Sequence, residues 1–334
     1  MAGPVVDVHH HFLPRAVFDR LKAEAGGAPR LVTDRLSLTL SPDLPDVDRH
    51  LQAMAEGGVG VAILTYSGVS TLGTDVCSLL NEGLSEVQRT ASGKLYGAAH
   101  VYLRDPDAPR QLEHAVQQLG LVAVALPTSE GDMGLDDPSL GPLWDVIEAL
   151  DTAVILHPTL LPRGATTDYG LERACARPFD TTIAAARLAY GVLPLHPRLR
   201  FVLPHVGGTT VFLRGRMAMF FQPGESGPTG LRAWQGMART VREQHASGLD
   251  QQFDLLWSRF YLDTAGTGGW SPAVEMGARV VGPGRLVFGS DYPLESHSGA
   301  TVGELVEMVR GLPLETAERE AILGGNARTL FGLP

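Results

Sequence analysis

Three consecutive histidines, His9, His10 and His11, end the short apolar run "VVDVHHH" near the start of the chain. The β-branched residues of this run predict a strand, and successive side chains of a strand point to opposite faces. His9 and His11 therefore face one way, and His10 faces the other way, where we expect it to pack behind the strand. Two imidazoles two residues apart on a strand can bind one divalent cation such as zinc. The strand-like residues before the histidines disfavour a tag remnant, whereas a structural histidine pair needs further residues to decide it.

Three more side chains of metal-ligand type stand at the ends of other apolar runs. His157 ends the run "TAVILH", His205 ends "LRFVLPH" and Asp291 ends "RLVFGSD". A single histidine of this kind is commonly a core residue. If the runs are parallel strands of one barrel, however, their carboxyl ends meet at the same mouth, where barrel enzymes build their active sites. Taken together, these residues predict a metal site at that mouth, with His9 and His11 among its ligands.

The elements that must position these residues recur along the whole chain. Short runs rich in Val, Leu and Ile lack strict alternation, which is typical of parallel strands buried on both faces. Amphipathic segments follow most of them. Eight such pairs predict an α/β fold, a (β/α)8 TIM barrel that residues 1–334 form as one domain. The runs occupy residues 5–11, 59–64, 95–103, 121–127, 152–158, 199–205, 259–265 and 285–291.

Two stretches do not fit the bare repeat of strand and helix. Residues 12–45 and 223–258 contain Pro, Gly and polar runs, and we expect them to be loop insertions after strands 1 and 6. Within the helical segment 180–192, Asp180 stands where an N-cap residue belongs. These are the points at which the repeat alone says least about structure.

Composition excludes several classes of protein. A net charge of −10 argues against binding to nucleic acid, which requires clustered Lys and Arg. The apolar runs are too short and too often interrupted to cross a membrane, and the first residues lack the pattern of a secretory signal. Cys77 and Cys175 are too few for a disulfide framework or a cysteine zinc cluster. We therefore expect a cytoplasmic protein without membrane contact.

Several motifs resemble one family along nearly the whole chain. The segments "DVHHHFLP", "ILHPT", "PHVGG", "FGSDYP" and "GGNARTLFGL" are similar to those of the amidohydrolase superfamily, in its branch of metal-dependent nonoxidative decarboxylases. That branch includes the aminocarboxymuconate semialdehyde, γ-resorcylate and 6-methylsalicylate decarboxylases. The resemblance implies that one divalent ion is bound by four ligands, with His205 beside the open coordination position; we expect zinc, with manganese as the alternative. Those ligands would be His9, His11, His157 and Asp291.

A second implication of the resemblance concerns the number of metal ions. Many hydrolases of the superfamily bridge two metals with a carboxylated lysine on strand 4. The corresponding run here is "LVAVALPTS", and the chain's lysines, Lys22 and Lys94, both lie outside it. A lysine-bridged pair of metals is therefore excluded, and one ion is expected.

The resemblance also suggests how a substrate is bound. Arg216 matches an arginine that, in the aminocarboxymuconate enzymes, reaches across a dimer interface to the substrate carboxylate, so a homodimer or larger homo-oligomer is expected. A second substrate-binding arginine of those enzymes, in the loop after strand 1, has no clear counterpart, although Arg15, Arg30 and Arg35 lie in that region. Four further residues near strand ends are candidates for the pocket: Arg163, Phe12, Tyr292 and His297.

Two reactions are open to such a site. In the favoured one, a small aromatic or unsaturated carboxylic acid, preferably of the ortho-hydroxy salicylate type, loses CO2 after Asp291, with His205 beside it, delivers a proton to the carbon bearing the carboxylate. In the alternative, the same residues hydrolyse or hydrate a lactone, an amide or an unsaturated acid. A barrel that keeps its metal only for stability is disfavoured, because every ligand position is filled.

Overall fold

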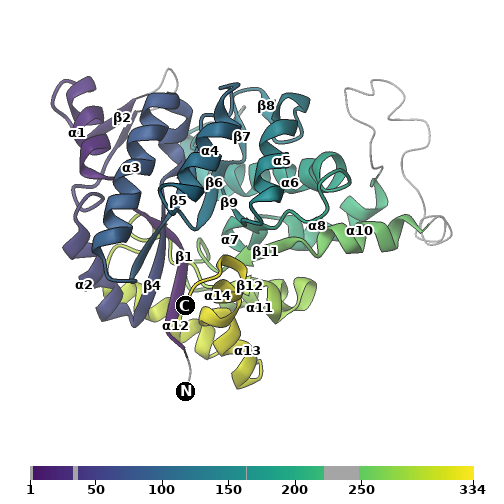
Figure 1. Ribbon diagram of the computed structural model, residues 1–334. Coiled ribbons are helices and arrows are strands. Elements are labelled where there is room, and N and C mark those ends of the chain that lie inside the picture. Colours follow the sequence, from purple (N-terminus) through teal and green to yellow (C-terminus); the bar gives the residue numbers. More distant parts are fainter. Residues whose placement is uncertain (1–2, 33–36, 163, 222–247) are drawn as a thin grey trace.

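The computed structural model describes residues 3–32, 37–162, 164–221 and 248–334, and within them eight parallel strands form one sheet in chain order (Figure 1). Backbone N–H groups of Val8 and His11 donate to the carbonyls of Phe288 (2.9 Å) and Tyr292 (2.7 Å), which joins the last strand to the first. The TIM-barrel fold is therefore confirmed. The strands are β1 (Val5–His11), β4 (Val59–Thr65), β5 (Leu95–His100), β6 (Ala123–Pro127), β9 (Val154–His157), β10 (Phe201–Leu203), β11 (Phe260–Asp263) and β12 (Leu286–Val287).

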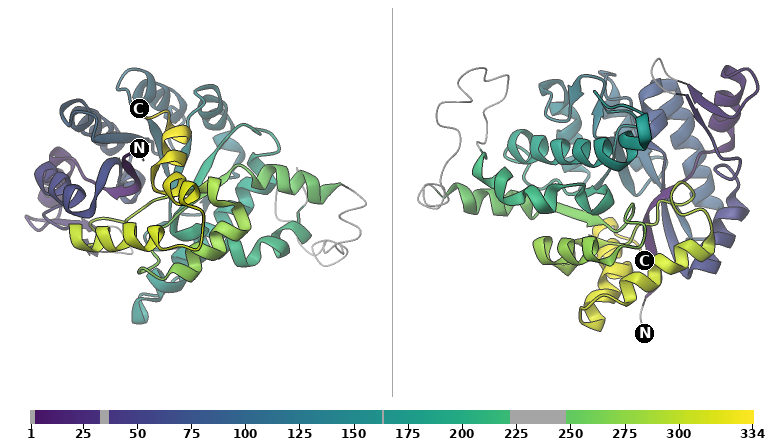
Figure 2. Two further views of the ribbon diagram at one scale, coloured as in Figure 1. Left: turned by 90° about the horizontal axis from the view of Figure 1, so that it is seen from below. Right: turned by 180° about the vertical axis from the view of Figure 1, so that it is seen from behind.

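Helices surround the strands, and the two chain ends lie on the same side of the molecule (Figure 2). The α2 helix shows why they form where they do. Asp46 accepts a hydrogen bond from the Arg49 N–H at its start, and Gly58 adopts a left-handed conformation at its end. The main helices are α1 (Arg15–Glu24), α2 (Val47–Gly57), α3 (Thr74–Thr90), α4 (Ala108–Gln117), α5 (Gly141–Ala149), α6 (Arg177–Arg187), α8 (Thr210–Met219), α10 (Leu249–Trp257), α11 (Ser271–Val281), α12 (Gly299–Arg310), α13 (Thr316–Glu320) and α14 (Asn326–Phe331).

The prediction that Asp180 caps a helix is wrong. The α6 helix begins three residues earlier, at Arg177, so Asp180 lies within its first turn. Its carboxylate accepts hydrogen bonds from the Thr128 hydroxyl and the Thr159 N–H instead. Asp180 thus ties the helix to the ends of β6 and β9, because tertiary partners compete with the helix terminus for its oxygens.

The barrel interior is filled by small side chains. Ala98, Ala123 and Ala125 pack with Val6, Val8 and other residues drawn from strands all around the barrel. Residues of α14, among them Leu330 and Phe331, complete this cluster. A larger apolar layer between strands and helices makes up the rest of the core. The interior is therefore solid, and chemistry is confined to the mouth.

A β-bulge in β1 sets the direction of the opening histidines. Pairing with β4 matches Asp7 with Ala62 and His10 with Leu64, so two residues of β1, Val8 and His9, oppose the single residue between them on β4. Such a bulge interrupts the alternation of faces. Val6 and Val8 point into the barrel, and after the bulge His9 and His11 also point inward while His10 points out.

The two stretches expected as insertions are only partly described. After β1 the chain forms α1 and a small antiparallel pair, β2 (Arg30–Val32) and β3 (Ser37–Thr39). Of residues 223–258, those up to 247 lie outside the described residues, and the remainder contains the whole of α10, with Phe253 and Trp257 buried. Among the described residues, no helix is both long and apolar enough to cross a membrane.

Candidate metal centre

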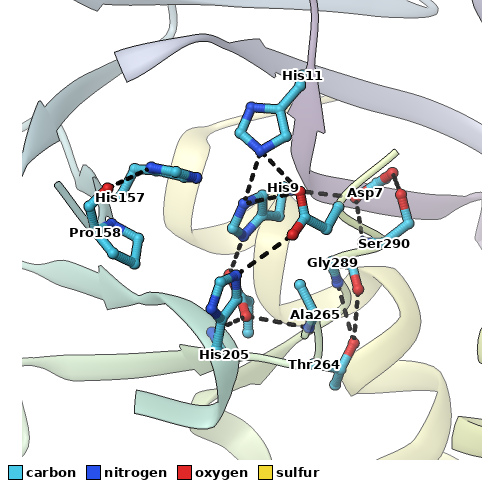
Figure 3. A network of polar contacts seen from close by, with 12 residues as sticks. Asp7, His9, His11, His157, Pro158, His205, Thr264, Ala265, Gly289 and Ser290 are labelled. Carbon is cyan, nitrogen blue, oxygen red and sulfur yellow. Dashed lines mark hydrogen bonds and ion pairs between the residues drawn. The ribbon is translucent and has the colours of Figure 1, made fainter. Parts of the chain in front are cut away.

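Side chains from four parts of the barrel converge at its mouth (Figure 3). His9 and His11 come from β1, His157 ends β9, and His205 and Asp291 follow β10 and β12. The Nε2 atoms of His9 and His11 are 3.2 Å apart, and His11 Nε2 lies 2.8 Å from Asp291 Oδ1. His205 Nε2 lies 3.5 Å from Asp291 Oδ2. The structure thus brings together all five residues that the strand ends singled out.

The hydrogen bonds around these residues leave their ligand atoms free. The Nδ1–H of His9 donates to Asp263 Oδ2 (2.7 Å), and the Nδ1–H of His157 donates to the Pro158 carbonyl (2.9 Å). Each ring therefore turns an Nε2 lone pair towards the centre. His205 Nε2 and Asp291 Oδ1 are buried there without a hydrogen-bond partner. Buried polar atoms are rarely left unsatisfied, so this arrangement calls for a group that accepts electron pairs.

A divalent metal ion fits that requirement. The ligand atoms of His9, His11 and His157 all lie within 4.8 Å of one another, and so do those of His9, His205 and Asp291. Imidazole nitrogens and one carboxylate oxygen form a donor set that suits zinc, manganese, iron or cobalt. The geometry supports a single cation centre shared by the two triads, with His9 common to both.

The charges of the site also favour a cation. Burial lowers the pKa of His11 and lowers that of His157 well below its usual value, so both rings are neutral at neutral pH and able to donate an electron pair. Burial would raise the pKa of Asp291, but His9 and His11 hold it well below its usual value, so the carboxylate is ionised. The attraction of Asp263 and Asp291 outweighs burial at His9 and raises its pKa to about 9. A metal ion would replace that proton.

The backbone is strained where two of these residues sit. His205 and Asp291 both have left-handed φ values, 56° in each case, which non-glycine residues adopt at some cost in energy. Gly266 makes the position of His205 possible, since a Cβ at this glycine would lie 2.6 Å from the His205 ring. This left-handed backbone conformation directs the two side chains towards the centre instead of along the strands.

Asp263, at the end of β11, is a functional residue that the sequence analysis missed. Its Oδ2 accepts the His9 Nδ1–H, and its Oδ1 accepts the backbone N–H groups of His205 (2.7 Å) and Ala265 (3.1 Å). One carboxylate therefore fixes the tautomer of His9 and the loop that carries His205. Part of the signal was available, because Asp263 directly follows the apolar residues Phe260, Tyr261 and Leu262 within the seventh run.

Phe12 and Tyr292, expected to line the pocket, lie elsewhere. Phe12 is 1% exposed and packs edge-to-face on His50 of α2, 5.1 Å between ring centres. Tyr292 is also buried and contacts His10 (5.1 Å) and His50 (5.2 Å). Phe12 shares the outward face of His10 by the alternation of the strand, and Tyr292 pairs with His10. The structure does not support the prediction for these two residues.

Of the other substrate candidates, the two that the structure describes, His297 and Arg216, are exposed. His297 is exposed, and its Nδ1 lies 3.2 Å from the Pro293 carbonyl. Arg163 lies outside the described residues. Arg216 is exposed on α8, with its guanidinium 5.1 Å from the centre of the Phe220 ring.

A cavity of about 590 Å³ opens beside the centre. His205 and Glu295 form part of its wall, together with the apolar side chains of Phe212, Trp270 and Met276. Burial and the neighbouring Asp291 raise the pKa of Glu295. The cavity has the size of a pocket for a small molecule and places apolar surface next to the candidate metal ligands.

Comparison with known proteins bears on the chemistry. A model of the amidohydrolase family matches residues 6–333. The 2-amino-3-carboxymuconate-6-semialdehyde decarboxylase of Dictyostelium discoideum is 22% identical, over 98% of this chain and 91% of the relative. The γ-resorcylate decarboxylase of Rhodococcus jostii is 26% identical over 100% and 99%. The 6-methylsalicylic acid decarboxylase of Aspergillus aculeatus is 27% identical over 86% and 84%.

Solved structures share the fold. The 5-carboxyvanillate decarboxylase of Sphingomonas paucimobilis superimposes with a TM-score of 0.79 at 21% identity, covering 99% of each chain. The dihydroxybenzoic acid decarboxylase of Polaromonas, solved with manganese and 2-nitroresorcinol, has a TM-score of 0.71 at 22% identity and covers 100% of this chain and 98% of its own. In both comparisons the shared fold covers nearly the full length of each chain.

Proposed function

This chain belongs to the amidohydrolase family, and we propose that it is a mononuclear metal-dependent decarboxylase that removes CO2 nonoxidatively from a small aromatic acid. The observation that carries the proposal is the cluster of three imidazoles and one carboxylate whose free electron pairs meet at the barrel mouth. Relatives that match over most of their length are decarboxylases of carboxylic acids. An ortho-hydroxy acid of the salicylate type is the favoured substrate.

The residues of the site have separate roles in the proposed reaction. A divalent ion bound by His9, His11, His157 and Asp291 would supply Lewis acidity to the carboxylate and neighbouring hydroxyl of the substrate. Asp291, ionised at neutral pH, takes a proton from the substrate hydroxyl and delivers it to the carbon bearing the carboxylate. The bond to that carboxylate then breaks, its electron pair returns to the ring, and CO2 leaves. His205, 3.5 Å from Asp291 Oδ2, orients the Asp291 carboxylate during the proton transfer.

The identity of the metal is a finer proposal. We favour zinc, because three imidazoles and a carboxylate are a common donor set for it, and keep manganese as the alternative, since the Polaromonas relative was solved with that metal. Protein purified without added metal should contain about one divalent ion per chain by elemental analysis. Zinc in that position supports the preference, and manganese overturns it.

Assembly and location also remain proposals. Arg216 is exposed on α8, one turn beyond Phe212, which is 80% exposed beside the cavity. An apolar side chain so exposed at a pocket favours contact with a second copy of the chain, so we propose a homodimer in which Arg216 reaches the partner's substrate. Size-exclusion chromatography with light scattering tests this, and a fully active monomer would overturn it. One domain over residues 1–334 and a cytoplasmic location stay predictions.

Incubation of metal-loaded protein with a panel of ortho-hydroxy aromatic acids tests the function. The panel contains 2,6-dihydroxybenzoate, the ligand of a solved decarboxylase with this fold, 6-methylsalicylate and 5-carboxyvanillate. We expect CO2 and the matching phenol in equal amounts from at least one acid. A panel that yields no CO2, together with hydrolysis of a lactone or amide by the same protein, would replace the proposal with the hydrolytic reaction.

A further inference from the structure

Arg177, the first residue of α6, carries a half-buried positive charge that the proposed reaction has not used. Its Nε–H and one Nη2–H donate to the Leu160 carbonyl, at 3.1 Å and 2.9 Å. That carbonyl belongs to the loop after β9, three residues beyond the candidate ligand His157. The interaction holds the guanidinium by one edge and leaves the opposite edge, formed by Nη1 and the second Nη2–H, directed elsewhere.

The charge of Arg177 acts on residues that follow two other strands, β4 and β12. Burial and Asp291 raise the pKa of Tyr66, and Arg177 partly opposes this rise. The Tyr66 ring lies 5.6 Å from that of His11. Arg177 also interacts electrostatically with Asp291 and Glu295, which follow the last strand. Pro178, the next residue along α6, lines the cavity together with His205 and Glu295, so Arg177 lies at the barrel mouth beside that cavity.

No carboxylate neutralises this guanidinium by direct contact among the described residues. Asp180, the nearest acid along the chain, accepts hydrogen bonds from Thr128 and Thr159, and Glu172 lies 3.6 Å from Arg173. On the same helix as Arg177, Arg187 does form an ion pair, with Asp136 at 2.6 Å. A partly buried cation without such a partner is costly to keep, and burial lowers the pKa of Arg177. An anionic ligand would restore the missing partner.

We propose that Arg177 binds the carboxylate of the aromatic acid through its free guanidinium edge. An arginine edge presents two parallel N–H groups that match the two oxygens of a carboxylate. Arg177 supplies this charge from the start of α6, next to the loop after β9. The proposal rests on the decarboxylase function and adds to it the residue that selects acids over neutral phenols.

A pair of ligands that differ only in the carboxylate separates this role from a structural one. With metal-loaded protein, calorimetry measures binding of 2,6-dihydroxybenzoate and of resorcinol, the same ring without the acid. We expect Arg177→Met to weaken binding of the acid by about 10- to 100-fold, as for the loss of a hydrogen bond between charged groups. Binding of resorcinol and metal content should change less than about twofold. Arg177→Lys should recover part of the affinity for the acid.

Arg187→Met is the matched control, since it removes a positive charge from the same helix away from the mouth. We expect it to leave binding of both ligands unchanged. Equal weakening of both ligands by Arg177→Met, or loss of metal, would assign Arg177 a structural role and overturn the proposal. An unchanged affinity for the acid would overturn it as well and leave the decarboxylase function standing. A wild-type protein that binds or converts none of the acids of the panel would refute both.

Discussion

Two clusters of buried histidines lie on opposite faces of β1, and they differ in one respect that decides their function. The metal-side cluster consists of His9, His11, His157, His205 and Asp291. The rear cluster consists of Asp7, His10, His50, Ser290 and Tyr292. Both contain histidines whose rings are about 5 Å apart and one buried carboxylate. Residue type and burial therefore do not distinguish them.

The rear cluster satisfies its polar atoms from within the protein. Asp7 Oδ2 accepts the Ser290 hydroxyl (2.5 Å) and the His10 Nδ1–H (2.9 Å). His10 Nε2 and His50 Nδ1 share a hydrogen bond (2.8 Å), and the Nε2–H of His50 donates to the carbonyls of Asp43 and Leu44. The chain of donors and acceptors ends on the backbone. Nothing in it is left for a metal ion, in contrast to the orphaned atoms of His205 and Asp291.

The β-bulge of β1 lies between the two clusters and contacts both of them. Asp7 Oδ1 accepts the backbone N–H of His9, the bulged residue, and that of Ser290, which precedes Asp291. The rear cluster therefore stabilises the local backbone that turns His9 towards the metal side. What the difference teaches is that unsatisfied electron pairs, and not histidine content, mark the reactive face of a strand.

The largest expected effect comes from Asp291, which serves the metal and the proton transfer at once. Asp291→Asn removes the anionic oxygen and the proton carrier, so we expect CO2 release to fall about 10³-fold or more. Asp7→Asn changes the buried carboxylate of the rear cluster in the same way and is the matched control. Its rate should fall less than that of Asp291→Asn, measured as phenol formed per minute by folded protein. Equal rates for the two variants would erase the distinction between the clusters.

Neighbouring histidines provide the next comparison. His11→Gln removes an imidazole from the metal side, and we expect metal affinity to fall about 100-fold or more, since a ligand of the ion is lost. His10→Gln alters the rear cluster one residue away and should change metal affinity by less than about threefold. Competition with a chromophoric chelator measures both. A large loss of metal in folded His10→Gln would show that the rear cluster belongs to the metal site.

Much of the difference between the two clusters could be predicted from the sequence, and the structure shows which part could not. Alternation along a strand correctly separated His9 and His11 from His10, and apolar runs located all eight strands. Alternation could not reveal that a bulge turns His9 inward after two valines that already face inward, because that depends on pairing with β4. The same rule, applied to Phe12, would have placed it with His10.

Contacts between distant segments account for the remaining gaps. Asp263 and Arg177 act through partners that are far from them in the chain, such as His9, more than 250 residues before Asp263. Apolar periodicity carries no information on which carboxylate will meet which imidazole. Strand ends narrow the choice to one mouth of the barrel, and only the folded geometry selects among the charged residues gathered there.

A smaller effect is expected from Asp263, which touches the metal ligands without being one. Asp263→Asn keeps the size of the side chain but weakens the hold on the His9 ring, and we expect metal affinity to fall about 10- to 100-fold. Zinc titration against a chelator measures the loss, with circular dichroism to verify folding. An affinity equal to that of the wild type would mean that the bulge alone orients His9.

The smallest effect concerns the pH dependence of stability and returns to the rear cluster. Burial lowers the pKa of His50 from 6.5 to about 3. The folded protein therefore keeps this ring neutral at pH 5.5, whereas the unfolded chain binds a proton there, so stability falls as the pH drops below 6.5. From pH 7 to pH 5.5 the loss from His50 is about 1 kcal/mol. His50→Gln is destabilised at both pH values, but its free energy of unfolding, measured by urea denaturation, should fall by about 1 kcal/mol less between pH 7 and pH 5.5 than that of the wild type. An unchanged dependence on pH would mean that His50 binds its proton equally well in the folded and the unfolded chain, and that burial does not keep this ring neutral.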